Sequence, residues 1–367
     1  MNPDIFIVGA GPAGLSAGIS AAMAGFSVEI ADSAAPPIDK ACGEGLMPDS
    51  VASLTELGVD LSSVESAEFR GIRFIGQRRT AEAQFPGAPG QGVRRTVLHP
   101  LLLERAEKLG VRFRWKTVVR GMENGAITLD GTTVRPRWIV GADGHQSRVR
   151  HWAGLDSGRL RSKRIGLRQH FAIAPWSQFV EIYWGEKAQA YVTPVAKDEI
   201  CVAFMSRQKY ASVAEALAHF PELKERLGVA ETSDAPRGAV SLVKRLHHVS
   251  RGNVALIGDA SGSIDAITGE GMAVGFRQAV ALAAALKADN LNGYEVAHHA
   301  IGRVPHFTSD GMLMMDKIGV VQRRVLKALA HKPELFQQML KIHIGHTKLQ
   351  VLGRDGVLRL GLGLLTT

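Results

Sequence analysis

Cysteine is nearly absent from this chain, which carries only Cys42 and Cys201 among 367 residues. Two cysteines so far apart do not make the disulfide framework of a small secreted protein, so a reducing compartment is expected. They also lack the spacing of a zinc site. Histidine pairs such as His247–His248 and His343 with His346 have no partners at ligand spacing. No metal site is therefore predicted.

Long apolar runs and a secretory signal are also missing. The best candidate, 271–286, is interrupted by Arg277 and Gln278, whereas about 18 uninterrupted apolar residues are needed to span a membrane. The opening MNPDIFIVGAG lacks the basic and apolar regions of a secretory signal. A soluble, cytoplasmic protein is expected. With 46% hydrophobic and 22% charged residues, the composition is that of an ordinary globular chain, long enough for two domains.

Positive charge is concentrated in the last part of the chain. Residues 316–367 contain nine lysines and arginines against three acidic residues, in a chain of net charge +9. Such a segment can contact nucleic acid, an anionic membrane or an acidic substrate, or it can be the solvated face of a helix. The solvated face is preferred and no nucleic-acid partner is expected, while peripheral membrane or lipid contact stays open.

A glycine-rich turn follows the first apolar segment. Residues 4–9, DIFIVG, read as a buried strand, and small residues at helical spacing follow until Gly25. Gly9 permits the tight turn, Gly11 lets backbone N–H groups approach a pyrophosphate, and Gly14 lets the helix pack on the strand. The pyrophosphate would lie at the helix N-terminus, which favours an anion. The turn contains Gly9, Gly11, Pro12, Ala13 and Gly14.

An acidic residue ends the next strand. In SVEIAD, Asp32 is placed to accept hydrogen bonds from ribose hydroxyls, and a carboxylate there disfavours a 2′-phosphate. Glu29 is the rival acid, but it lies inside the strand. Strand, helix and strand together predict the start of an open parallel sheet in an α/β fold. The glycine pattern alone does not separate FAD from NAD.

The remaining chain alternates between sheet and helix. Weak alternation over 66–85 predicts strands, 99–110 predicts a helix, and four alternating segments over 165–206 predict a mostly antiparallel sheet. The Ala-rich 271–288 predicts a helix, and Ile318, Val321, Val325 and Leu329 recur at helical spacing beyond residue 300. We expect a first domain made of 1–65, 96–160 and 236–300, an inserted domain made of 66–95 and 161–235, and a helical segment 301–367.

Two later motifs make a family resemblance specific. GADGHQSRVR (141–150) places Asp143 and Gly144 after an apolar strand, and IGDASGS (257–263) places Gly258 and Asp259 after another. With GAGPAG they resemble the three-part signature of FAD-dependent oxidoreductases of the p-hydroxybenzoate hydroxylase fold. DKACGEGLMP (39–48) and TGEG (268–271) are similar to the geranylgeranyl reductase branch. That branch is related to flavin-dependent halogenases and hydroxylases.

This resemblance implies a Rossmann-type FAD-binding domain with an inserted, mostly antiparallel sheet and a helical C-terminus. It implies that Asp259 bonds a ribityl hydroxyl and that the helix from about Met272 aims its positive end at the flavin. Arg95 matches the arginine that reaches the cofactor, with Arg94 as a rival. No second glycine motif follows a strand, so NAD(P)H would dock transiently or a separate reductase would supply electrons. Other cofactor-binding candidates are Cys42, Gly43, Gly269 and Gly271.

Catalytic residues are less clear from the sequence. Cys42 is either a thiol near the flavin or a small buried side chain in a tight loop. Period-two alternation puts Arg168 and His170 on one face and Tyr191 and Thr193 on another, and either pair could line the substrate cavity. Lys40 and Glu44 flank the same loop.

Departures from the family signature shape the expected reaction. Ala266 replaces the usual proline, and Gln189–Pro194, QAYVTP, keeps only the proline of the reductase motif Y-x-W-x-F-P. The halogenase element W-x-W-x-I-P is absent. A monooxygenase acting on an aromatic, polyketide-like or lipidic small molecule is therefore placed slightly ahead of a reductase of a prenyl or lipid double bond. A peripheral lipid-binding flavoprotein and an NAD-dependent dehydrogenase are the remaining alternatives.

Overall fold

A six-stranded sheet forms the first half of the molecule. The computed structural model describes residues 2–186 and 188–347. The strand order is β18-β19-β12-β1-β2-β8, and all pairs are parallel except that of β18 with β19. The predicted opening of an α/β fold is confirmed. The strands are β1 (Ile5–Val8), β2 (Val28–Ala31), β8 (Arg112–Arg114), β12 (Trp138–Gly141), β18 (Ser250–Arg251) and β19 (Val254–Leu256).

Helices from distant parts of the chain share one core with this sheet. β1 and β2 are buried at every position, and α1 (Pro12–Met23) and α7 (Gly271–Lys287) supply small and apolar side chains to the same cluster. The helix expected at 99–110 begins earlier, as α3 (Arg95–Lys108). The other elements here are α2 (Pro48–Glu56), α4 (Arg148–Trp152), β9 (Gly121–Glu123), β10 (Ala126–Leu129), β11 (Thr132–Val134), η1 (Gly258–Ser261) and η2 (Ala266–Thr268).

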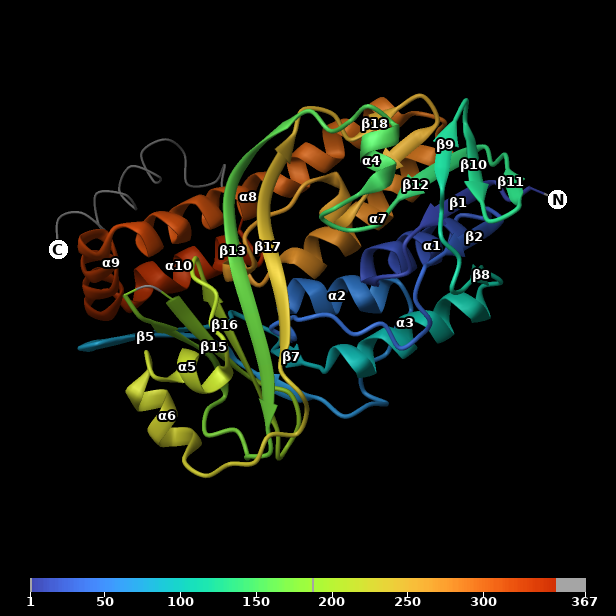
Figure 1. Cartoon of the computed structure of the whole chain (residues 1–367). Helices are drawn as coiled ribbons and strands as arrows, with labels where there is room; N and C mark the ends of the chain where they lie inside the picture. Colours follow the sequence, from blue (N-terminus) through green and yellow to red (C-terminus); the bar gives the residue numbers. More distant parts are fainter. Residues whose placement is uncertain (1, 187, 348–367) are drawn as a thin grey trace.

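A seven-stranded sheet forms the second half. Its order is β17-β13-β16-β15-β14-β5-β6, and only the β14–β5 pair is parallel, so the mostly antiparallel prediction for 165–206 is confirmed. Residues 237–246, assigned above to the first domain, form the edge strand β17 beside β13 (Figure 1). The strands are β5 (Gly71–Gly76), β6 (Arg79–Gln84), β13 (Gly158–Phe171), β14 (Phe179–Trp184), β15 (Ala188–Pro194), β16 (Ile200–Ser206) and β17 (Arg237–Leu246). A small third sheet contains β3 (Gly45–Leu46), β7 (Gly90–Gly92) and β4 (Ala67–Phe69).

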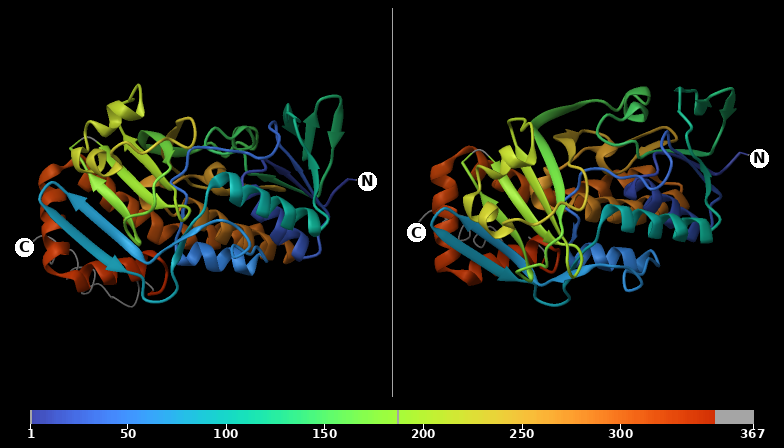
Figure 2. Two further views of the ribbon diagram at one scale, coloured as in Figure 1. Left: turned by 90° about the horizontal axis from the view of Figure 1, so that it is seen from below. Right: turned by 60° about the horizontal axis from the view of Figure 1, so that its bottom comes forward.

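Helices pack against the large sheet in two separate apolar clusters. The short helices α5 (Val213–Leu217) and α6 (Pro221–Leu227) share one cluster with β15 and β16. The C-terminal helices share the other with β5, β6 and β14, and Figure 2 shows them beside the β5–β6 hairpin. These helices are α8 (Leu291–Lys317), α9 (Gly319–His331) and α10 (Pro333–His343).

The predicted apolar stripe beyond residue 300 is largely confirmed. Val325 and Leu329 are buried in α9 and Val321 packs against the same cluster. Ile318 differs, because it lies between α8 and α9, where no helix face directs it inward, and it is 47% exposed. Among the described helices, none combines the length and apolar character needed to cross a bilayer.

Candidate active site

A cavity of about 630 Å³ lies where the two large sheets meet. One wall is built from the segments that leave the carboxyl ends of β1, β2, β12 and β19, where open parallel sheets bind ligands. The other wall is one face of the seven-stranded sheet, including β13, β14, β15 and β16. The volume is in the range of small-molecule and cofactor sites.

Nearly all candidate cofactor residues line this single cavity. The structure brings together segments from positions 9 to 275, which sequence distance alone does not connect. Gly14 and His170, and the rival candidates Glu29 and Arg94, do not line it. The lining candidates are Gly9, Gly11, Pro12, Ala13, Asp32, Cys42, Gly43, Arg95, Asp143, Gly144, Arg168, Tyr191, Gly258, Asp259, Gly269, Gly271 and Met272.

The three glycines of the first turn differ in what surrounds them. Gly9 has φ of +106°, and a Cβ there would lie 2.4 Å from the carbonyl oxygen of Ala142. A Cβ on Gly14 would lie 1.9 Å from the carbonyl oxygen of Gly9, so this glycine serves close helix–strand packing. At Gly11 the nearest atom is Arg95 Nη2 at 3.9 Å. The space beside Gly11 is therefore open for a ligand to approach the backbone.

Two of the predicted acids line the cavity and also accept hydrogen bonds from backbone N–H groups. Asp32 accepts hydrogen bonds from the N–H groups of Ala10 and Ala34, both at 2.8 Å. Asp143 accepts from the Ser147 hydroxyl at 2.5 Å and from the Arg148 N–H at 2.7 Å, at the start of α4. Each carboxylate therefore fixes a turn that faces the cavity.

Glu29, the alternative to Asp32, forms ion pairs away from the cavity. Its buried carboxylate pairs with Arg112, at 3.2 Å, and with Arg114, both on the neighbouring strand β8. Glu29 does not line the cavity.

Asp259 is the predicted acid whose side chain remains partly open. It lies 3.2 Å from His145 Nε2 and 3.6 Å from Lys40 Nζ, and its side chain is 39% exposed. Gly258 precedes it with φ of +59°, and a Cβ there would lie 2.7 Å from the Cβ of Ala13. The turn after β19 is thus pressed against the start of α1 and presents Asp259 at the cavity.

The N-terminus of α7 faces the cavity through small residues. Gly269 is left-handed, with φ of +70°, and a Cβ on Gly271 would meet nothing within 4 Å. Gly271 and Met272 begin a 17-residue helix, whose unpaired N–H groups and dipole stabilise negative charge at this end. Glu270, between the two glycines, does not line the cavity and is 1% exposed.

Two neighbouring arginines have separate roles. Arg95, the first residue of α3, lines the cavity, and its side-chain Nε has no hydrogen-bond partner among the described residues. Arg94 does not line the cavity and pairs with Glu199 and Asp234, each at 3.3 Å. Arg95 is therefore the arginine available to a bound anion.

Cys42 lines the cavity as a thiol. It is partly exposed, while Gly43 beside it has open space around its Cα. Burial raises the pKa of Cys42, and Arg95 opposes this shift only in part. A neutral thiol is a weak nucleophile, so the geometry favours a contact role for Cys42.

The four sheet candidates lie on one face of the large sheet. Arg168 pairs with Ala203, which pairs with Tyr191, and His170 pairs with Cys201, which pairs with Thr193. Directly opposed residues in adjacent strands project to the same side. The prediction of two different faces is therefore wrong, because alternation within a strand does not give the register between strands.

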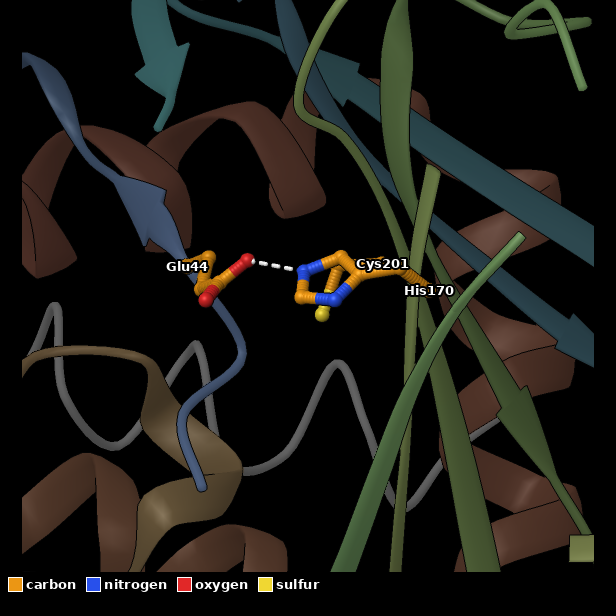
Figure 3. A group of neighbouring side chains, drawn as sticks. All are labelled: Glu44, His170 and Cys201. Atoms are coloured by element: carbon orange, nitrogen blue, oxygen red, sulfur yellow. Dashed lines mark hydrogen bonds and ion pairs between the residues drawn. The ribbon is translucent and has the colours of Figure 1, made fainter. Parts of the chain in front are cut away.

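His170 is enclosed by acids from two loops. Its Nε2 lies 2.5 Å from Glu44 Oε2 (Figure 3), and its Nδ1 lies 2.8 Å from Asp234 Oδ2. The imidazole is completely buried. Burial alone would raise the pKa of Asp234, but hydrogen bonds from His170 and the charges of His170 and Arg168 hold it below its usual value. This enclosure explains why His170 does not line the cavity while Glu44 does.

Glu44, His170 and Cys201 carry donor atoms within 4.8 Å of one another, a set that a metal ion could use. Two ligands on one zinc ion lie about 3.3 Å apart, given metal–ligand bonds of about 2.0–2.1 Å. The 2.5 Å separation of Glu44 and His170 is instead a hydrogen-bond length. Burial raises the pKa of the Cys201 thiol well above its ordinary value, which also disfavours a metal-binding thiolate.

The sequence did not indicate the roles of several charged groups near the cavity. Asp234 lies in an irregular loop, far in sequence from His170, and no pattern links the two. Arg164 and Asp265 form a fully buried ion pair at 3.0 Å, and Asp265 lines the cavity. Arg164 could have been noticed, since a charged residue at a core position of a strand is rarely unpaired.

The cavity suits FAD on its own geometry. Open backbone at Gly11 and an unpartnered Arg95 fit a pyrophosphate, Asp259 offers a carboxylate to ribityl hydroxyls, and α7 presents its N-terminus. The family model described as "FAD binding domain" matches residues 2–296. The chain belongs to this FAD-binding family and is an FAD-dependent oxidoreductase, and the resemblance based on its motifs is confirmed.

Relatives fall into both reaction classes considered above. Menaquinone reductase of Mycobacterium tuberculosis is 28% identical over 301 residues, 75% of this chain and 74% of its own length. Digeranylgeranylglycerophospholipid reductase 1 of Methanothermobacter thermautotrophicus is 26% identical, over 75% of this chain and 74% of its own. Pentachlorophenol 4-monooxygenase of Sphingobium chlorophenolicum is 26% identical, over 75% of this chain but 56% of its own.

A solved structure shows the same fold along the whole chain. A flavoprotein/dehydrogenase from Cytophaga hutchinsonii superimposes with a TM-score of 0.84 at 18% identity, covering 100% of this chain and 98% of that one. The expected architecture, an α/β cofactor-binding part with an inserted sheet and a helical C-terminus, is confirmed.

Proposed function

We propose that the protein is an FAD-dependent reductase that saturates a carbon–carbon double bond in a lipophilic substrate. The observation that supports the substrate class is the wall opposite the glycine turns. It is mainly apolar, and burying hydrocarbon against it is favourable by about 25 cal/mol per Å². The apolar lining of this wall comes from Ile72, Val180, Ile182, Ala203 and Met205, and Ile267 of η2 packs beside it.

The reaction class is supported by the relatives. Two reductases named for a quinone and for a glycerophospholipid match about three quarters of both chains. Bound FAD supplies hydride-transfer chemistry, and the chain positions the substrate and excludes water. NAD(P)H docking transiently, or a separate reductase, would supply the electrons, since no second nucleotide-binding turn was identified in the sequence.

Anaerobic single turnover tests this proposal. The FAD-loaded protein is photoreduced without oxygen and mixed with menaquinone in detergent. The expected result is reappearance of the oxidised flavin spectrum together with a product that has gained two hydrogen atoms on a carbon–carbon bond, seen by mass spectrometry. Oxidised flavin with hydrogen gained only at the quinone oxygens would contradict double-bond reduction.

A monooxygenase is the second candidate. It is favoured by the match to pentachlorophenol 4-monooxygenase and by the loss of the reductase motif at Gln189–Pro194. Substrate-dependent oxygen uptake, with NAD(P)H consumed in equal amount and one oxygen atom in the product, would establish it over the reductase.

We also propose peripheral contact with an anionic membrane through α8 and α9. Val296, Phe307 and Met314 are exposed and lie on one side of α8 at helical spacing. On α9, exposed Arg323 and Arg324 follow exposed Val320 in a helix without acidic residues. Apolar side chains beside cations are typical of interfacial helices.

Vesicle sedimentation tests the membrane proposal. The protein should sediment with phosphatidylserine-containing vesicles and only weakly with phosphatidylcholine vesicles. The double variant Arg323→Glu, Arg324→Glu should lose most of this binding while retaining FAD. Equal binding by the wild type and this variant would contradict the proposal.

A further inference from the structure

Glu44 occupies a backbone conformation that its residue type disfavours. Its φ is +59°, although it lies between two glycines, which adopt this region freely. A residue other than glycine held in the left-handed region costs of the order of 1–3 kcal/mol and persists where the surroundings enforce it. Glu44 is nevertheless 2% exposed and lines the cavity. The contacts of its side chain are therefore what holds the loop in this conformation.

Both oxygens of that side chain are engaged. Oε1 accepts a hydrogen bond from the Arg95 N–H at 2.9 Å, at the start of α3. Oε2 lies 2.5 Å from His170 Nε2. The Nδ1 of His170 faces Asp234, and Asp234 Oδ1 also accepts from the His170 backbone N–H at 3.1 Å. Asp234 Oδ2 and Arg168 Nη1, which lies 2.6 Å from Nδ1, together fix the ring so that Nε2 points to Glu44.

The charges of the ion-pair cluster around His170 balance only if the cluster holds one more proton. Within the described residues, the linked ion pairs contain four carboxylates and three guanidinium groups, so a neutral imidazole would leave one excess negative charge. One proton shared between Glu44 and His170 balances the set. Because the cluster is largely buried, one unbalanced charge would raise its electrostatic energy strongly. The carboxylates are Glu44, Asp234, Asp39 and Glu199, and the guanidinium groups are Arg94, Arg168 and Arg237.

We propose that Glu44 and His170 form a dyad that holds one proton at the cavity and donates it to the substrate. The proposal rests on the double-bond reduction proposed above. Saturating a C=C bond adds a hydride to one carbon and a proton to the other. Bound FAD would supply the hydride, and Glu44, which lines the cavity, would pass the proton it takes from His170 Nε2 to the second carbon once its carboxyl leaves the Arg95 N–H. His170 Nδ1 stays between Asp234 and Arg168 throughout, and water that enters after product release restores the proton.

Tyr191 is the competing donor on the same wall, and it is less suited. Its hydroxyl lies 3.5 Å from the carbonyl oxygen of Ile267, and burial raises its pKa far above the ordinary range. Cys42 and Cys201 also lie near the dyad, and burial raises the pKa of both thiols. Arg168, which touches Asp39, Asp234 and His170 Nδ1, is a permanent cation. Of these groups on the wall, the dyad is the remaining candidate for the proton donor.

Infrared difference spectroscopy tests the dyad without turnover. The FAD-loaded protein is photoreduced in H₂O and in D₂O, with no substrate present. Because reduction places charge near the dyad, a carboxyl C=O band that shifts in D₂O should appear in the wild type. It should be absent from Glu44→Gln. The matched control Glu199→Gln, which removes a carboxylate of the same cluster that does not touch His170, should keep the band.

Single turnover with menaquinone supplies the second measurement. Glu44→Gln should slow flavin reoxidation by about 10²–10⁴-fold, the usual contribution of a positioned acid. It should leave dithionite reduction and FAD content unchanged. Asp234→Asn, which spares the cavity wall, tests His170 as a positioning residue and should alter the pH profile of this step.

The outcomes separate the two proposals. An infrared band in the wild type that persists unchanged in Glu44→Gln overturns the dyad. So does a Glu44→Gln variant that hydrogenates menaquinone at the wild-type rate. If the wild type shows the Glu44 band but does not hydrogenate the substrate, the proposed function fails while the proton-holding pair stands.

Discussion

Alanine at Gly11 and alanine at Gly14 should have opposite effects, although the two positions are three residues apart in the same turn. At Gly14 a Cβ would lie 1.9 Å from a backbone carbonyl oxygen, which cannot move aside as a flexible side chain can. At Gly11 the backbone angles are φ −69° and ψ 176°, which alanine adopts freely, and the nearest atom is 3.9 Å away.

These geometries set the expected magnitudes. Gly14→Ala should lower the stability of the FAD-free protein by about 3 kcal/mol or more, at the upper end of overpacking costs. Gly11→Ala should leave it unchanged or raise it by about 0.4–1 kcal/mol, since alanine restricts the unfolded chain. The same methyl group would occupy the space where the pyrophosphate approaches the backbone. We expect FAD affinity to fall at least about tenfold, or about 1.4 kcal/mol.

Two assays separate the effects. Urea unfolding of the FAD-free proteins measures stability, and quenching of flavin fluorescence measures affinity. Normal FAD affinity in Gly11→Ala would refute the placement of the pyrophosphate beside this residue. A loss of stability in Gly11→Ala as large as in Gly14→Ala would refute the packing argument.

Three further predictions concern single residues. Arg95→Gln should weaken FAD binding by about tenfold or more, through loss of a charged hydrogen bond, whereas Arg94→Gln should bind FAD normally and unfold at lower temperature; calorimetry and fluorescence titration of both check this. Burial, with Asp49 adding to it, raises the pKa of Glu270 well above 4.5, so the folded protein retains this proton longer than the unfolded chain and loses stability as pH rises above about 4.5. Glu270→Gln should therefore raise the melting temperature at about pH 8 and have little effect near pH 4.5, and an equal effect at both pH values would contradict the assignment. Cys42, whose pKa is raised by burial, should react with iodoacetamide more slowly at neutral pH than an exposed cysteine of a model peptide, as mass spectrometry of the alkylated protein would show.

The cofactor-binding half was predictable because local rules determine it. A glycine turn between a buried strand and a helix requires Gly9 and Gly14 at fixed spacing, and acids after strand ends, such as Asp143 and Asp259, meet at one edge of a parallel sheet. The sequence therefore predicted which segments converge. It could not show that Asp32 and Asp143 also bind backbone N–H groups, since such turns depend on loop geometry.

The substrate-facing half was less predictable because it depends on long-range pairing. Register between β13, β15 and β16 puts Arg168 and Tyr191 on one face, and no feature of one strand encodes this. The enclosure of His170 needs Glu44 and Asp234, which are separated from it by 126 and 64 residues. Glu44 was noticed only as part of a loop, because its strained backbone is invisible in the sequence.

The central claim is that one FAD molecule occupies the cavity between the two sheets. A titration of the FAD-free protein with FAD, followed by the visible absorption of the flavin, tests it most directly. The account predicts a perturbed flavin band that saturates at one FAD per chain and that needs at least about tenfold more free FAD to appear in Gly11→Ala. Flavin absorption that stays identical to free FAD at every ratio would contradict it.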